Sequence, residues 1–113
     1  MRTRLLITTV VLALALPAVA EFRTVQRAHE VEPADIRLPQ HERGTLAFRD
    51  CAECAFTVKR VTAETRWILN GRPVRLDQFR TELAAAADRE RVSLIVLHHL
   101  ETDRITEVLA TVR

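Results

Sequence analysis

The chain is 113 residues long, which is enough for one domain with its own core and too short for two. It has 17 Lys and Arg against 15 Asp and Glu, but two of the basic residues, Arg2 and Arg4, lie in a segment that we expect to be removed. The remaining chain is formally neutral. It lacks the basic surplus or stripe of a nucleic-acid binder, so the sequence argues against a nucleic-acid partner.

The first twenty residues have the pattern of a secretory signal peptide. Two arginines near the start are followed by an uninterrupted run of apolar and Thr residues over 5–16, Pro17 breaks the run, and residues 18–20 (AVA) supply a small-x-small cleavage site. The apolar run is shorter than the roughly 20 residues that cross a bilayer, and no later segment is apolar enough to span one. We therefore expect cleavage after Ala20 and a mature chain that is periplasmic or secreted, without a membrane span.

The mature chain divides into two parts by composition. Residues 21–43 contain Pro33 and Pro39, alternating charges and only scattered apolar residues, and we interpret them as an extended N-terminal arm or edge strand. From Gly44 onward the pattern is clearer, and residues 44–113 are expected to form a single β-rich domain.

Within that domain, alternation of apolar and polar residues predicts strands at 45–49 (TLAFR), at 55–61 (AFTVKRV) and at 65–69 (TRWIL). Asn70-Gly71 is the strongest hairpin signal in the chain. It predicts a short return strand at 72–74, in which Pro73 indicates an edge position. Trp67, a large aromatic residue in a small β-domain, is expected in or near the core.

One helix is predicted at residues 76–89 (LDQFRTELAAAADR), because Leu76, Phe79, Leu83 and Ala86 or Ala87 recur at helical spacing. The segments RVSLIVLHHL and ITEVLATV, joined by a polar ETDR turn, predict a C-terminal hairpin. The fold class is therefore mainly β (α+β), with one packed helix and a C-terminal β-hairpin. The sheet is expected to be a small twisted antiparallel sheet or a partly closed OB- or SH3-like barrel.

The only two cysteines, Cys51 and Cys54, are three positions apart between predicted strands. In an oxidising compartment two nearby cysteines form a disulfide by default. The intervening Ala52-Glu53 lacks the Gly or Asn that a tight turn prefers, so a covalent bridge would hold a chain reversal that this pair would not hold alone. We therefore predict a structural Cys51–Cys54 disulfide.

Two other interpretations of the cysteine pair stay open. Thioredoxin-type redox chemistry needs a CxxC at a helix N-terminus, whereas strand-like sequence surrounds this pair, and the neighbouring Asp50 and Glu53 disfavour a thiolate. A metal site would need further ligands, for which the candidates are His41 and His98. The alternative function is thus a metal-binding or thiol-redox protein that uses both cysteines and a histidine.

Other catalytic motifs are not visible in the sequence. Ser93, the only serine, lies inside a predicted strand and not at the sharp, Gly-flanked turn of a nucleophile elbow. The two glycines, Gly44 and Gly71, are too far apart for a phosphate-binding loop. We therefore expect no enzyme activity, no catalytic residues and no cofactor.

The stretch CAEC…VTAETRWILNGRPVRLDQFR carries a resemblance to known proteins. The motifs follow in this order: a GT at the start of a strand, a CxxC, a core of the pattern T-x-x-T-x-[aromatic]…G-x-x-V-x-L-x-x-F, and a final hairpin. It resembles a loose group of small exported bacterial proteins of unknown function, over residues 44–112. The resemblance implies an OB-like or small-barrel architecture and an exported location, and it implies no activity. The second half of the chain also resembles a broader class of small exported β-domains. Those domains often have Gly-rich turns after the core, whereas this chain has a longer alanine-rich helix.

The sequence as a whole therefore predicts an exported, non-catalytic binding or accessory module that is stabilised by a disulfide. Its partner would be an unidentified protein or a component of the cell envelope, contacted by a sheet face or a sheet edge.

Overall fold

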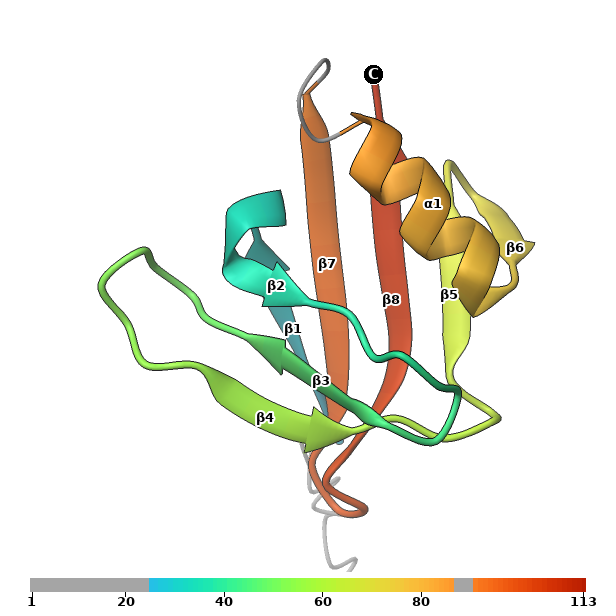
Figure 1. The fold of residues 1–113 in the computed structure, drawn as a ribbon. Helices are drawn as coiled ribbons and strands as arrows, with labels where there is room; N and C mark the ends of the chain where they lie inside the picture. The colour runs from blue at the N-terminus through green and yellow to red at the C-terminus, as the bar shows by residue number, and fades with distance from the viewer. Residues whose placement is uncertain (1–24, 87–90) are drawn as a thin grey trace, which may run out of the picture.

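The computed structural model describes residues 25–86 and 91–113, so the predicted signal peptide lies outside the described residues. Over these two ranges the chain forms eight strands, one α-helix and one short 3₁₀ helix (Figure 1). In chain order the elements are β1 (Gln26–Val31), η1 (Pro33–Asp35), β2 (Ile36–Arg37), β3 (Thr45–Phe48), β4 (Thr57–Arg60), β5 (Arg66–Leu69), β6 (Arg72–Val74), α1 (Leu76–Ala86), β7 (Val92–His99) and β8 (Arg104–Val112).

The strands belong to one open, twisted sheet of mixed direction. β1, β7 and β8 pair antiparallel, but β8 also pairs in parallel with β5, for example Trp67 with Val108. A single parallel pair, Arg60 with Arg104, joins the β2-β3-β4 part to the start of β8. The mainly β fold with one helix and a C-terminal hairpin is therefore confirmed, and the sheet is open and mixed in direction, where the sequence predicted an antiparallel sheet or a partly closed barrel. The physical reason is the path of the chain: α1 carries it from the edge strand β6 to β7, and β8 then returns into the position beside β5.

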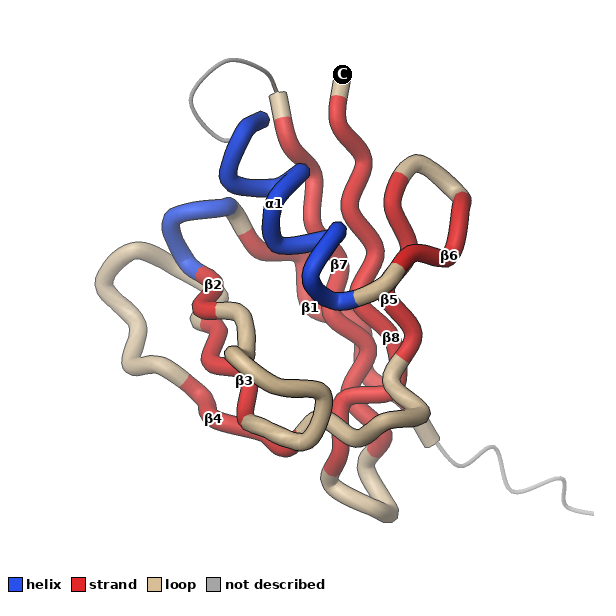
Figure 2. Tube along the Cα trace, turned by 45° about the vertical axis from the view of Figure 1, so that its right-hand side comes forward, coloured by secondary structure: helices blue, strands red, loops and turns tan. Residues whose placement is uncertain are grey.

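The helix and the β2-β3-β4 part lie on the same side of the β7-β8-β5 strands (Figures 1 and 2). The core fills the space between these layers. It consists of Val31, Ile36, Leu46, Phe48, Val61, Trp67, Leu76, Phe79, Leu83, Leu94, Val96, Ile105, Val108 and Ala110. Because neighbouring side chains of a strand point to opposite faces, half-buried Ile95 and Leu109 belong to the other face of the sheet.

The predicted Asn70-Gly71 hairpin is confirmed. Asn70 and Gly71 have φ angles of 50° and 80°, as a two-residue primed turn requires. The Asn70 side chain also accepts a hydrogen bond from the Val112 backbone N–H at 2.8 Å, so the turn is attached to the end of β8. β6, which contains Pro73, pairs only with β5 in the described sheet and so occupies the predicted edge position.

The apolar stripe of the predicted helix is also confirmed. Leu76, Phe79, Leu83 and Ala86 are its buried residues. The ring of Phe79 lies 5.3 Å from that of Trp67 between centroids, so the helix packs directly onto β5, and Trp67 is a core residue as expected. The last predicted helical residues, 87–89, lie outside the described residues.

The stretch that the sequence left least defined takes part in the sheet. β1 pairs along its whole length with β7, and Val31 and Ile36 enter the core. The buried carboxylate of Asp35 accepts a hydrogen bond from Arg49 Nε at 2.8 Å, which satisfies a charge that would be costly to bury alone. This ion pair fastens η1 to the end of β3.

Candidate functional site

The disulfide predicted between Cys51 and Cys54 is present. It closes the turn at the tip of the β3-β4 connection, where the two Cα atoms are 5.1 Å apart and the Cys54 N–H donates to the Cys51 carbonyl at 3.1 Å. The four residues of this turn are all exposed. The bridge thus holds the chain reversal that Ala52-Glu53 would not favour by itself.

The segments on both sides of the disulfide turn are attached to the rest of the fold. On one side, Asp50 Oδ1 lies 3.0 Å from His29 Nδ1 on β1. On the other, the ring of Phe56 is covered by the guanidinium groups of Arg37 and Arg49, at 4.3 and 4.6 Å from its centroid. The turn therefore connects the two layers of the domain, and this arrangement favours a bracing role.

Removal of the bridge gives a testable prediction. The double variant Cys51→Ser/Cys54→Ser should lose about 2 kcal/mol of unfolding free energy, because a four-residue loop restricts the unfolded chain only modestly. Urea unfolding of the oxidised protein and of the variant measures the difference. Reductant should lower the stability of the parent protein to that of the variant and leave the variant unchanged. Equal stability of the oxidised and reduced parent would contradict the bracing role.

The four residues of the alternative metal set are not brought together. His41 precedes β3 and the two cysteines follow it, so they lie at opposite ends of that strand. His98 is buried in β7 and bound to a carboxylate, and the cysteine sulfurs are joined to each other. In the two described ranges, no group of three or more His, Cys, Asp or Glu residues is arranged to hold a metal ion.

His98, one of the two histidines of this set, contacts an aspartate that also pairs with a lysine. His98 Nε2 lies 2.7 Å from Asp103 Oδ1, and Lys59 Nζ lies 2.8 Å from the same oxygen. Asp103 sits in the β7-β8 turn with φ of 55°, a conformation that Asp and Asn tolerate better than most residues. The cluster therefore joins the β7-β8 turn to β4.

This cluster predicts a pH effect. The hydrogen bonds from Lys59 and then His98 hold the pKa of Asp103 below its ordinary value of 3.8. A lowered folded-state pKa contributes stability that is complete above the unfolded value and is lost as the pH falls through the folded one. Asp103→Asn, which keeps the positive φ, should therefore lose less stability than the parent when the pH is lowered through and below about 3.8.

Urea midpoints measured from neutral pH to pH 2.5 test this expectation. Glu64→Gln serves as the matched control, because Glu64 is exposed and its carboxylate takes no part in the cluster of Lys59, His98 and Asp103. Identical acid profiles for Asp103→Asn and the parent would contradict the prediction.

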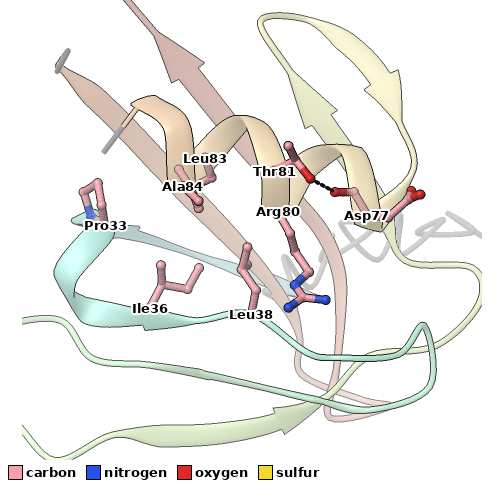
Figure 3. Close-up of a pocket in the computed structure, with 8 residues that line it drawn as sticks. All are labelled: Pro33, Ile36, Leu38, Asp77, Arg80, Thr81, Leu83 and Ala84. Atoms are coloured by element: carbon pink, nitrogen blue, oxygen red, sulfur yellow. Dashed lines mark hydrogen bonds between the residues drawn. The ribbon is translucent and has the colours of Figure 1, made fainter. Parts of the chain in front are cut away.

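A groove lies between β2 and α1, next to the core (Figure 3). Its volume is about 580 Å³, within the range of roughly 300–1,000 Å³ that ligand sites occupy. It is lined by Pro33, Ile36, Leu38, Asp77, Arg80, Thr81, Leu83 and Ala84. The lining is apolar along most of its length and polar towards the N-terminal end of the helix.

The polar end of the groove contains one arginine, Arg80, and one aspartate, Asp77. Figure 3 shows the Arg80 side chain extending towards Leu38, whereas the Asp77 carboxylate points away from it. Arg80 Nη2 donates a long hydrogen bond, of 3.3 Å, to Gln40 Oε1. An adjoining hollow is lined by Arg80, by two more arginines, Arg43 and Arg75, and by the acidic residues Glu42 and Asp77, so it has a small cationic excess.

Sequence reasoning did not identify this groove. Its helical wall could have been found from the second face of the helix, since Asp77, Arg80, Thr81 and Ala84 recur at the spacing i, i+3, i+4, i+7. Its other wall comes from the stretch 33–38, where the sequence carried no decisive secondary-structure signal.

Comparisons with known proteins add no assignment: no protein-family model matches this chain, and no curated protein or solved structure is significantly similar to it. Among the described residues, the helix is too short and too polar to cross a membrane.

Proposed function

We propose that this chain is an exported, non-catalytic module that binds another protein or a component of the cell envelope. The observation that carries the proposal is the groove between β2 and α1, in which an apolar floor, a sheet edge and an opening with a small cationic excess adjoin one another. The signal-peptide pattern of residues 1–20 and the disulfide support the exported location.

Site-specific photocrosslinking in cells that export the protein tests this proposal. A benzophenone amino acid is placed in the groove wall at Thr81, on the outer sheet face at Thr111, or at the control position Arg72 in β6; all three positions are exposed. A discrete adduct at Thr81 or Thr111, absent at Arg72, supports a binding module. Recovery of uncrosslinked monomer at every position, in several growth conditions, would overturn it.

The exposure of Cys51 and Cys54 favours one rival, thiol–disulfide exchange with a partner. The single variant Cys54→Ser distinguishes the two functions, because it leaves the Cys51 thiol free to form a mixed disulfide. A binding module should yield no reducible adduct in excess of that formed by Cys51→Ser. A specific, reductant-sensitive adduct of Cys54→Ser alone would favour the redox function.

A further inference from the structure

Strand β2 ends the β4-β3-β2 part of the sheet, so its second edge faces away from β3. The carbonyl of Asp35, one residue before β2, accepts a hydrogen bond from the Arg49 N–H at 3.0 Å. In an antiparallel pair the backbone groups of successive residues point alternately to one side and the other. The backbone N–H and C=O groups of Ile36 are therefore directed away from β3, at the edge where another strand could add.

The helix provides the wall opposite this edge. Its groove-facing positions, Asp77, Arg80, Thr81 and Ala84, lie beside the buried stripe and not within it, and Arg80 alone among them is half-buried. The groove is thus lined on one side by residues 77–84 of the helix and on the other by residues 33–38. Alternate side chains of an extended segment placed in it would face the apolar floor, because strand side chains have a period of two.

The charged residues at the opening of the groove indicate which peptides it would bind. The cationic groups at its opening, from Arg80 with Arg43 and Arg75 close by, outnumber the two carboxylates of Glu42 and Asp77 that line the same hollow. Arginine presents several N–H donors in a planar arrangement that matches a carboxylate, and such charge-assisted hydrogen bonds are among the stronger ones.

We propose that the groove binds an extended peptide segment of a partner protein by strand addition to β2. Small aliphatic side chains at alternate positions of the peptide pack on Ile36, Leu38 and Leu83, and a peptide carboxylate, from Asp, Glu or a free C-terminus, pairs with Arg80. This inference depends on the proposed binding function and specifies its site and the class of its partner.

Selection from a random peptide library displayed on phage, against the exported and disulfide-intact protein, provides the probe. The enriched peptides should alternate aliphatic and variable residues and carry an acidic group at one end. Failure to enrich any peptide, or enrichment of sequences without an acidic group, would overturn the proposal.

Variants then locate the site, with a fluorescein-labelled synthetic copy of the enriched peptide and fluorescence anisotropy as the readout. Arg80→Glu should weaken binding by about tenfold or more, since a charge-assisted pair becomes a repulsion. Arg72→Glu, the same charge reversal at an exposed position on β6, should leave binding within about twofold, because Arg72 does not line the groove or the adjoining hollow. Urea unfolding of both variants verifies that they are folded. Equal affinities for the two variants would contradict the assignment of the site.

Chemical changes to the peptide test strand addition without altering the protein. Methylation of single backbone nitrogens should abolish binding at every second position, because only alternate N–H groups of an added strand face β2. Methylation that has no effect, or has the same effect at each position, would exclude strand addition.

The photocrosslinking experiment on Thr81 and Thr111 distinguishes a failure of this inference from a failure of the proposed function. Partner adducts from Thr111 on the outer face, without adducts from Thr81, would preserve the binding function and overturn the groove as its site. Adducts from Thr81 that contain two copies of this chain would identify self-association and likewise overturn the proposed partner class.

Discussion

Replacement of Phe79 by alanine is expected to lower the free energy of unfolding by about 3–5 kcal/mol, the range observed when a buried Phe is truncated. The Phe79 side chain has no exposed surface, and its ring packs against Trp67. Domains of this size have about 5–15 kcal/mol of stability in total, so the loss should be a substantial fraction of it. Urea unfolding followed by far-ultraviolet circular dichroism measures the loss, because Trp67 fluorescence would itself change with its neighbour.

The adjacent residue supplies the matched control. Gln78 is exposed on the same helix, and Gln78→Ala should change the free energy of unfolding by no more than about 0.5 kcal/mol. If Phe79→Ala cost as little as this control, α1 would not close the core, and the groove between α1 and β2 would lose one of its walls.

The second large effect is expected in the β2-β3-β4 part of the sheet. Phe48 is 1% exposed, and its ring lies 4.8 Å from that of His29 on β1 between centroids. Phe48→Ala should therefore also cost about 3–5 kcal/mol of unfolding free energy, measured by urea unfolding at neutral pH. The cost arises because the cavity would open between the two layers of the domain.

Val58 on β4 is the control for this prediction. It pairs with Ala47 on the neighbouring strand, but it is 58% exposed and lies outside the core. Val58→Ala should cost less than about 1 kcal/mol, mainly through reduced β-propensity. A larger cost for Val58→Ala than for Phe48→Ala would mean that the opposite face of this hairpin is the buried one.

These two positions also show where sequence reasoning reached its limit. Alternation around Phe48 and around Val58 predicted strands at both places, and both strands exist. The pattern does not state which face of a short strand meets the core, because a shift of one residue exchanges the faces. That choice is made by the other layer of the domain, which covers Phe48 and leaves Val58 in solvent.

The groove also depends on residues that are far apart in the sequence. Arg80 and Leu38 are separated by the whole β3-to-β6 region, and they line one hollow because α1 and β2 pack on the same side of the sheet. The parallel pairing of β5 with β8 is equally distant in the chain. Neither could be inferred from a window of a few residues.

The sequence by itself determined the features whose causes are local: the Asn70-Gly71 turn, the buried stripe of the helix, the C-terminal hairpin and the bridge between two cysteines three residues apart. Backbone preference, helical periodicity and short loop closure act over a few residues, so a single chain displays them. Only the tertiary structure decided the strand order, the buried face of each short strand and the groove. Those depend on which distant apolar faces exclude water together, and many arrangements of the same elements satisfy the local preferences equally well.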